Sequence, residues 1–484
     1  MIFLNNVVML PGTVWENKLQ NISGQVIAAT EYGAEINTTG VNYPPVIVFQ
    51  CQKNWRIFTD QNALKDYLQQ SDLSINIDAC LEHAFFGGST VFEWCFDDSY
   101  ICPPISRIIL RDGNVEFDHR YVELSKEHSD YEKAKRLFMA GIDEKLTNLE
   151  NVDIGVSGGL DSRLVMAIAN KAKNLTVKRC HMLVDVGGLL RSVDEKSAAQ
   201  ICNLYGHKLE RLYFEKRTFD DLISGELNEN LIGTCEALRS CSSAETVSAV
   251  HLTGSHGFLV QNPDVNEINI DWVLTHKTMF YRNISFQNFR KALNLLSGST
   301  REVKQVFLKP SDTYEILRNK LERFFDKLTN LTPPEALLNY SYIVQGQKNA
   351  LGMFESFNGK YYPVSIYADV IEPALASVHS ADLDGRKFIL RFLNDLDPRA
   401  KNVQGQGVKV LSSNKLRKIA ALASIILRGS GVMNYRERAR GIDGFYDEDE
   451  ILSLHPFNEL IQNRMEMDPG AWSNIRKINA ITKL

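Results

Sequence analysis

Apolar residues recur along the chain at spacings that predict a regular series of helices and strands between residues 131 and 214. Apolar side chains at positions 131, 134, 138, 142 and 146 form one face of a helix over 131–146. The apolar run 152–156 predicts a buried strand, and the apolar run 163–169 predicts a helix directly after it. The two glycines between these runs indicate a tight turn from the strand into the helix.

The pattern then repeats toward residue 214. The run 175–184 predicts a second strand, and Ser192-Val193-Asp194-Glu195 has the spacing of a capping box at the start of a helix. Gly206 marks the end of that helix, and 208–214 is a third strand candidate. This βαβαβ order implies a parallel sheet that binds ligands at the carboxyl ends of its strands.

The N-terminal third has shorter and more β-rich elements. Strands are expected over 46–50 and 55–60 around a turn, with a helix over 62–69. At 484 residues, with 44% hydrophobic residues and 14 prolines, the chain has the composition of a globular protein of two domains. The sequence therefore predicts an α/β protein with a β-rich α+β domain over 1–125 and a parallel-sheet domain over 126–484.

The turn at 157–162 carries the clearest chemistry. It reads Ser157-Gly158-Gly159-Leu160-Asp161-Ser162. Adjacent glycines let backbone N–H groups approach an anion, and the two serines add hydroxyl donors at a helix N-terminus, where the helix dipole favours negative charge. Asp161 cannot bind an anion directly, but it can hold Mg²⁺ that bridges to phosphate oxygens. The turn thus predicts a phosphate site with Mg²⁺ on Asp161.

This turn lacks the Gly-Lys-Ser/Thr of a Walker A loop and the G-x-G-x-x-G of a dinucleotide site. The hexapeptide instead resembles the pyrophosphate loop of the ATP pyrophosphatase superfamily, which implies ATP cleavage between the α and β phosphates. The alternative is an ordinary βα turn, because Ser, Gly and Asp are common at turns and helix N-caps.

Two downstream segments resemble asparagine synthetase and β-lactam synthetase. The segment 385–391 is similar to their Lys-x-x-Leu-Arg helix, and Arg399-Ala400-Lys401 is similar to the Arg-x-Lys segment, whose lysine lies over the reaction centre. Without the resemblance, Lys401 is a solvated loop lysine, followed by the glycine-rich 405–407 of a mobile loop. Residues 399–440 contain ten Lys or Arg and one acid, Glu437, a charge pattern that would attract a triphosphate or an acidic peptide segment.

The N-terminal third is similar to the latter half of the class II glutaminase (Ntn-type) domain of asparagine synthetase. Those glutaminases use an N-terminal cysteine nucleophile, whereas this chain has Ile2, and its first cysteine is Cys51, within a predicted strand. The resemblance implies a degenerate amidotransferase domain, followed by an adenine-nucleotide α-hydrolase-like synthetase domain. An amine would then have to come from the substrate.

Asparagine-synthetase-like chains with a degenerate amidotransferase domain include the β-lactam and carbapenam synthetases and the lasso-peptide macrolactam cyclases. The segment 251–263, which ends in Gln-Asn-Pro, and the segment 356–361 resemble loops of the microcin-type lasso cyclases. The overall resemblance extends over roughly 40–410.

Two positions in the resemblance need separate mention. The family's Gly-rich loop ends with an aspartate thought to bind Mg²⁺, but the matching residue here is Phe258; either Asp264 substitutes, or Asp161 acts alone, or the chain is impaired. Glu355 lies near the position of a glutamate that places or deprotonates the attacking amine, and its alternative role is that of a surface glutamate.

Composition excludes several other classes. A net charge of −5 argues against general nucleic-acid binding, and the longest apolar run, 419–427, is too short to cross a bilayer. No basic region precedes the first apolar residues, so a cytoplasmic location is expected. The eight cysteines form no C-x-x-C pair, which indicates buried thiols without a zinc site or a disulfide framework.

Together, the residues and the resemblance imply an ATP- and Mg²⁺-dependent ligase that adenylates a carboxylate and couples it to an amine. In the lasso-cyclase interpretation the substrate is a precursor peptide. A partner protease releases its N-terminus, and the ligase joins that N-terminus to an Asp or Glu side chain of the same peptide. Small-molecule carboxylate ligases of the β-lactam synthetase or asparagine synthetase type are alternatives. A non-catalytic scaffold that binds a peptide or nucleotide is a third, and Phe258 favours it.

Overall fold

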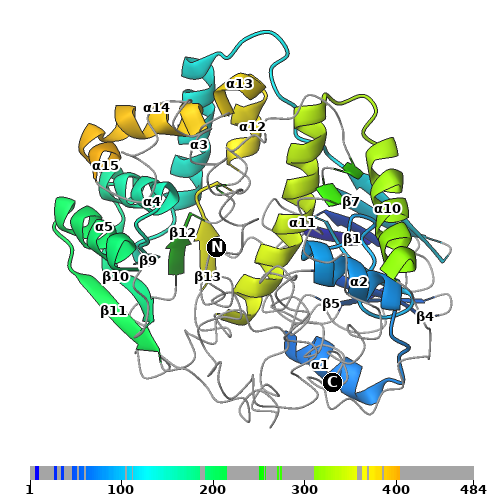
Figure 1. The fold of residues 1–484 in the computed structure, drawn as a ribbon. Coiled ribbons are helices and arrows are strands. Elements are labelled where there is room, and N and C mark those ends of the chain that lie inside the picture. The colour runs from blue at the N-terminus through cyan, green and yellow to red at the C-terminus, as the bar shows by residue number, and fades with distance from the viewer. Residues whose placement is uncertain are drawn as a thin grey trace.

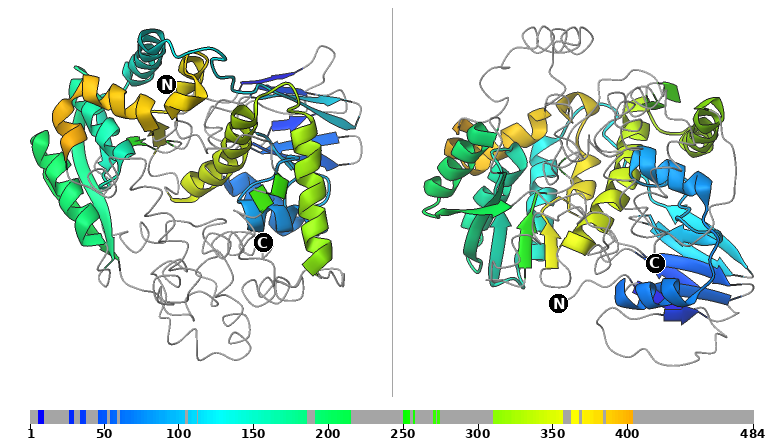
Figure 2. Two further views of the ribbon diagram at one scale, coloured as in Figure 1. Left: turned by 45° about the horizontal axis from the view of Figure 1, so that its top comes forward. Right: turned by 60° about the horizontal axis from the view of Figure 1, so that its bottom comes forward.

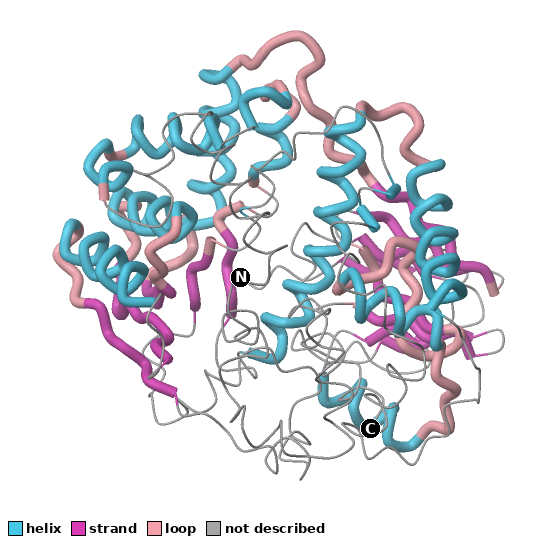
Figure 3. The backbone as a smooth tube through the Cα atoms, viewed as in Figure 1, coloured by secondary structure: helices cyan, strands magenta, loops and turns pink. Residues whose placement is uncertain are grey.

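The structure is a computed structural model of the chain. It describes residues 6–9, 27–29, 34–37, 46–51, 54–58, 61–103, 106–111, 113–185, 191–214, 250–254, 257, 270–271, 273–274, 310–356, 362–367, 370–383 and 386–403. Two groups of strands lie apart in the molecule, each with its own helices (Figure 1; Figure 3).

The first group consists of two antiparallel sheets from the N-terminal part of the chain. One four-stranded sheet has the order β1 (Asn6–Met9), β3 (Ala34–Asn37), β7 (Ser106–Arg111), β8 (Asn114–His119). The other has the order β2 (Ile27–Ala29), β5 (Asn54–Phe58), β4 (Ile47–Cys51), β6 (Ser99–Ile101). These strands, with helices α1 (Gln61–Gln70) and α2 (Ile77–Phe86), confirm the prediction of a β-rich N-terminal region.

Two helices from much later in the chain pack against this region. They are α10 (Pro310–Asp326) and α11 (Pro333–Ser356), and their apolar residues share one core with residues of β4, α1 and α2. The side chain of Gln347 on α11 exchanges two hydrogen bonds with the backbone of Ser89, at 2.8 and 2.9 Å. Figure 2 shows α10 and α11 beside the N-terminal strands in both views.

The second group is a five-stranded sheet in which every neighbouring pair is parallel. Its order is β11 (Leu209–Phe214), β10 (Thr176–Asp185), β9 (Asn151–Gly155), β12 (Val250–Thr253), β13 (Tyr362–Ser365). The chain runs from β9 outward to β11 and then returns to the other side of β9. The switch point of the topology therefore lies between β9 and β12.

The helices that accompany this sheet agree with the predicted βαβαβ order. They are α3 (Tyr131–Leu146), α4 (Leu160–Lys171), α5 (Arg191–Leu204), α12 (Ile371–Leu375), α13 (Ser380–Leu383), α14 (Lys387–Leu396) and α15 (Pro398–Asn402). The predicted apolar face of α3 is buried at every position. Asp130 caps this helix by accepting a hydrogen bond from the N–H of Lys133 at 3.0 Å.

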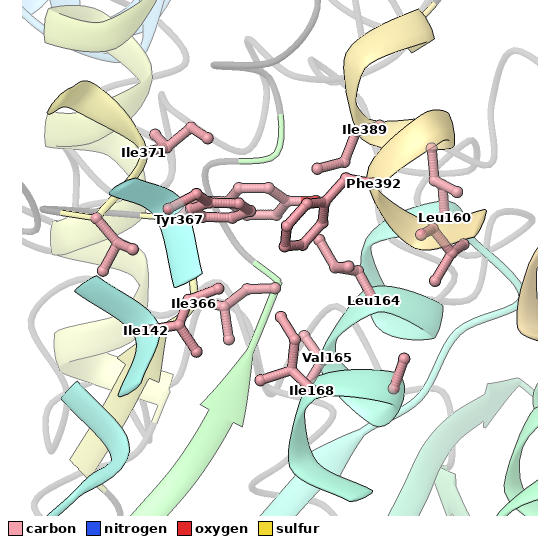
Figure 4. Close-up of a cluster of buried hydrophobic side chains, with 14 of the residues drawn as sticks. Ile142, Leu160, Leu164, Val165, Ile168, Ile366, Tyr367, Ile371, Ile389 and Phe392 are labelled. Atoms are coloured by element: carbon pink, nitrogen blue, oxygen red, sulfur yellow. The ribbon is translucent and has the colours of Figure 1, made fainter. Parts of the chain in front are cut away.

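The core of the second group forms between one face of the sheet and these helices. Val152, Ile154 and Leu252 contribute from the strands, and α3, α4, α12 and α14 cover them with branched and aromatic side chains. Figure 4 shows Tyr367 among Ile371, Leu164 and Phe392 in this core. Apolar packing thereby fixes the start of α4, where the candidate site lies.

The predicted buried thiols are largely confirmed. The described cysteines are all free, and five of these six are buried; Cys51 is half-buried. No helix in the described ranges is long and apolar enough to span a bilayer.

Candidate nucleotide site at the sheet switch point

The predicted phosphate turn connects β9 to α4 at the carboxyl edge of the sheet. Gly159 is the N-cap residue of α4, and its extended backbone (φ −72°, ψ 165°) makes no side-chain cap hydrogen bond. Ser157 and Gly159 are exposed. The Gly159 N–H donates to the Ser157 hydroxyl at 3.2 Å, but no side chain of the N-cap residue closes the helix start, which suits an anionic ligand.

The two predicted serines of the turn bond to each other and to the backbone of the turn. Their hydroxyl oxygens are 3.1 Å apart, and the Ser162 hydroxyl also donates to the carbonyl oxygen of Ser157 at 2.5 Å. Ser162 is buried, whereas Ser157 is exposed. Ser162 therefore shapes the turn, and the Ser157 hydroxyl is the one available to a ligand.

Asp161 lies in the first turn of α4 and accepts a hydrogen bond from the Tyr367 hydroxyl, with 2.8 Å between oxygens. Burial raises the pKa of Asp161 above the ordinary value, although this hydrogen bond and the positive charge of Arg386 act in the opposite direction. Tyr367 is fully buried and stacks on Phe138 at 6.1 Å between ring centroids. Packing thus fixes the hydroxyl that orients the carboxylate.

A second glycine segment meets Asp161 from the end of β12. A Cβ atom added to Gly254 would lie 2.8 Å from Asp161 Cβ, and one added to Gly257 would lie 2.3 Å from Asp161 Oδ1. A side chain at position 254 would meet the Asp161 backbone, and one at position 257 would displace the carboxylate. The two segments that the sequence marked as glycine-rich, 157–159 and 254–257, therefore converge at the switch point between β9 and β12.

Lys401 lies in α15, and not in a loop as the sequence indicated. Asp397 caps this short helix, Pro398 is its first residue, and Lys401 stands in the last turn. Lys401 is half-buried, and its Nζ is 3.4 Å from Asn394 Oδ1. The helical backbone of α15 therefore fixes the position from which the Lys401 ammonium extends.

The structure describes the remaining predicted site residues only in part. Glu355 belongs to the last turn of α11, whose backbone alone is described there. Phe258, Asp264, the glycines at 405 and 407 and the basic stretch beyond 403 lie outside the described residues. The Lys-x-x-Leu-Arg segment forms the start of α14 as expected.

The sequence reasoning missed Tyr367 and Arg163. Arg163 is 1% exposed, and its guanidinium donates hydrogen bonds to the carbonyl oxygens of Gly158 at 2.9 Å and Val403 at 2.8 Å. The one available signal was the arginine at the start of the otherwise apolar run 163–169, because an arginine at a buried helical position needs specific partners.

A polar cluster on the sheet face opposite the apolar core was also missed. Asp153 on β9 and Arg179 on β10 form a buried ion pair at 3.2 Å, and His181 and His251 lie beside it, with ring centroids 5.2 Å apart. Burial, together with neighbouring positive charge, lowers the pKa of His181 to about 4 and that of His251 to about 3. Both imidazoles are therefore neutral near pH 7, and His251 packs against Gly155 just before the phosphate turn.

Comparisons with known proteins do not assign this chain to a family. The sequence matches no protein-family profile and no curated protein. Among solved structures, it is similar to the U34-tRNA thiolase NcsA from Methanococcus maripaludis with its 4Fe-4S cluster, at 16% identity and a TM-score of 0.19, over 58% of this chain and 83% of that one. With so low a TM-score, the chemistry of the site has to follow from its own residues.

Proposed function

We propose that the chain is an ATP-dependent ligase that forms an amide through an acyl-adenylate. One observation carries the proposal: a helix N-terminus without a side-chain cap, a glycine turn and a half-buried carboxylate meet at the switch point of a five-stranded parallel sheet. Ligands of open parallel sheets bind at this point, and helix N-termini there hold phosphate groups.

The donor set suits Mg²⁺ that is shared with phosphate. In the described ranges, no group of three or more His, Cys, Asp or Glu residues could hold a metal ion, so Asp161 would supply one oxygen and phosphates and waters the others. Bound there, Mg²⁺ would neutralise charge on the departing pyrophosphate. The exposed Ser157 hydroxyl and the α4 N–H groups would hold the same phosphates.

The residues of the chain support the following reaction. A substrate carboxylate attacks the α phosphorus of ATP, the α–β phosphoanhydride bond breaks, and acyl-AMP and pyrophosphate form. An amine then attacks the acyl carbon, AMP leaves, and the amine loses its proton. Lys401 is our candidate for the cation that stabilises negative charge in both steps, and Glu355 is our candidate for placing or deprotonating the amine.

For the substrate we propose a precursor peptide that the enzyme closes into a macrolactam, as in lasso-peptide cyclases. This choice rests on the sequence resemblance of 251–263 and 356–361. The alternative is a small-molecule carboxylate, which would use the same phosphate turn and the same lysine. A peptide substrate would bring its own amine next to its own carboxylate, so that proximity supplies much of the rate.

The test is to incubate the purified chain with ATP, Mg²⁺ and a candidate substrate and to measure AMP and pyrophosphate. A cyclised peptide would have lost the mass of one water. AMP and pyrophosphate in equal amounts, absent with Asp161→Asn, would support the ligase. ADP and phosphate, or no turnover with peptides and small carboxylates, would favour the scaffold interpretation.

A further inference from the structure

We propose that Arg163 is a positioning residue that ties the phosphate turn to the chain segment following Lys401, so that Lys401 acts only while this tie is intact. The inference deepens the proposed function and rests on it. It concerns a side chain that the sequence resemblance did not assign to the site.

The tie is a single guanidinium between two backbone segments far apart in sequence. Nη2 donates to the carbonyl oxygen of Gly158 within the turn, and Nη1 donates to the carbonyl oxygen of Val403, two residues beyond Lys401. Because both acceptors are backbone atoms, the tie fixes the main chain of each segment and not merely a side chain.

Burying the Arg163 guanidinium at this position lowers the stability of the fold. Its side chain is almost fully buried, and no carboxylate in the described part of the chain pairs with it; burial lowers its pKa from the ordinary value. A buried charge without an opposite charge is costly, which indicates that its position and not packing alone is selected. Apolar neighbours at 160, 164 and 165 show that this part of α4 could otherwise be filled with aliphatic side chains.

The chemistry of arginine suits this role and that of lysine does not. A planar guanidinium carries donors that point in different directions, so it can bridge two carbonyl groups, whereas one ammonium nitrogen at the end of a shorter side chain cannot reach both. Arg163→Lys should therefore keep the charge and break the bridge.

The tie completes the anchoring of α15. At its start, the Asp397 carboxylate accepts hydrogen bonds from the N–H and the side chain of Arg399, both at 3.0 Å. At its end, the Val403 carbonyl is held by Arg163. Without the second anchor, the end of α15 that carries Lys401 is free to move relative to the turn.

The first measurement is hydrogen exchange of the ligand-free protein, which does not depend on activity. Arg163→Lys should speed exchange at least tenfold in two separate segments, 158–162 and 400–403, with other helices unchanged. Lys171→Gln, which removes an exposed charge from the other end of α4, is the matched control. Unchanged exchange in both segments would overturn the tie.

The second measurement is a double-mutant cycle on pyrophosphate release. Arg163→Lys should lower kcat about tenfold or more while KM for ATP changes less than about threefold, and in a Lys401→Ala background it should lower kcat less than about twofold. A merely structural defect would lower kcat equally in both backgrounds, and that result would overturn the proposal. If Arg163→Lys does not fold, Arg163→Gln, which is neutral and can reach only one carbonyl, takes its place in both measurements.

The two proposals fail differently. Faster exchange in both segments, with no AMP formed by the wild type, would retain the tie and remove the ligase. AMP formation by the wild type with an additive cycle would retain the ligase and remove the role of Arg163 toward Lys401.

Discussion

The Tyr367 hydroxyl donates a 2.8 Å hydrogen bond to Asp161 from 206 residues further along the chain. Tyr367 is buried in the second core, where it stacks on Phe138. Figure 4 shows it close to Ile371 and Phe392, so its ring has little freedom to turn away. The carboxylate that we assign to Mg²⁺ is thus oriented by the apolar core. Such supporting contacts normally fix the geometry of a metal ligand.

We expect Tyr367→Phe to lower the free energy of unfolding by roughly 1.5–3 kcal/mol, the range for losing a hydrogen bond to a charged group. It should also raise the pKa of Asp161, because the lost hydrogen bond lowers it in the wild type. The acid limb of the pH–rate profile should then move to higher pH. Urea unfolding and the pH dependence of pyrophosphate release measure the two effects.

The control for this change is Tyr340→Phe. The Tyr340 hydroxyl is buried in the other core and has no hydrogen-bond partner within the described ranges. Its removal should leave both the stability and the pH profile close to those of the wild type. Equal effects of the two substitutions would contradict a specific role for Tyr367.

Asp161→Asn should stabilise the fold at neutral pH while abolishing pyrophosphate release. Burial raises the pKa of Asp161 in the folded state, so folding favours its protonated form, and the stability of the wild type falls as pH rises through that pKa. The neutral amide avoids this loss. The advantage of the variant should vanish below about pH 4, where the unfolded carboxyl group is also protonated.

Urea titrations at several pH values measure this difference. A variant that is less stable than the wild type at pH 7 would show that the ionised carboxylate stabilises the fold. The same result would remove the inference that Asp161 is kept at a cost to stability for its function.

Periodicity predicted the order β9–α4–β10–α5–β11 because these segments carry runs of apolar residues separated by glycine and polar turn residues. The helix predicted over 131–146 has the bounds that the structure gives α3. Lys401 was assigned to a loop because five residues are too short for a periodic signal, although Asp397-Pro398 has the chemistry of a helix start. Tyr367 and Arg163 were missed because Tyr367 bonds to Asp161 across 206 residues and Arg163 bonds to Val403 across 240, and local spacing holds no information on such contacts.

Lys320→Met should destabilise the protein by about 3–5 kcal/mol, as expected when one member of a buried ion pair is removed. Lys320 Nζ lies 2.6 Å from Glu93 Oε2 and 3.4 Å from Glu82 Oε2, and Glu82 is fully buried. Its loss leaves Glu82 with hydrogen bonds from Ser89 and Thr90 but without a cation. Urea unfolding gives the change.

Arg318→Met on the same helix is the comparison. Arg318 pairs with Asp271 and Glu322 near the surface, where solvent screens the charges. Its loss should therefore lower the free energy of unfolding much less than the loss of Lys320. Adding Glu82→Gln to Lys320→Met should restore part of the stability. No recovery in the double variant would argue against an uncompensated Glu82 charge as the cause.

Gly257→Ala should abolish ATP binding or turnover, because a Cβ at this position would lie 2.3 Å from Asp161 Oδ1 and must push the carboxylate aside. Gly206→Ala provides the matched control. Gly206 has a positive φ of 76° and open space around it, so alanine there strains the backbone far from Asp161. Gly206→Ala should lower the melting temperature and leave the KM for ATP unchanged; loss of ATP affinity in both variants would indicate a general effect of instability.

Lys401→Ala should reduce pyrophosphate release by orders of magnitude and change the free energy of unfolding by less than about 1 kcal/mol. Lys401 is half-buried, its side chain makes a long 3.4 Å polar contact with Asn394 in the described part of the chain, and alanine is favourable in a helix. Stability and turnover should therefore separate in this variant. Lys401→Arg should also release pyrophosphate slowly, because a planar guanidinium cannot replace a compact ammonium at a crowded phosphorus centre.

The decisive comparison is made at saturating ATP and substrate, with Lys387→Ala as the control. Lys387 is an exposed lysine at the start of α14 that donates to the carbonyl oxygen of Ala381 at 3.0 Å, so its loss should leave turnover near that of the wild type. If Lys401→Ala retains more than about half of the wild-type rate, it cannot supply charge stabilisation in the transition state. In that case Arg386, whose charge already acts on Asp161, becomes the next cation to replace.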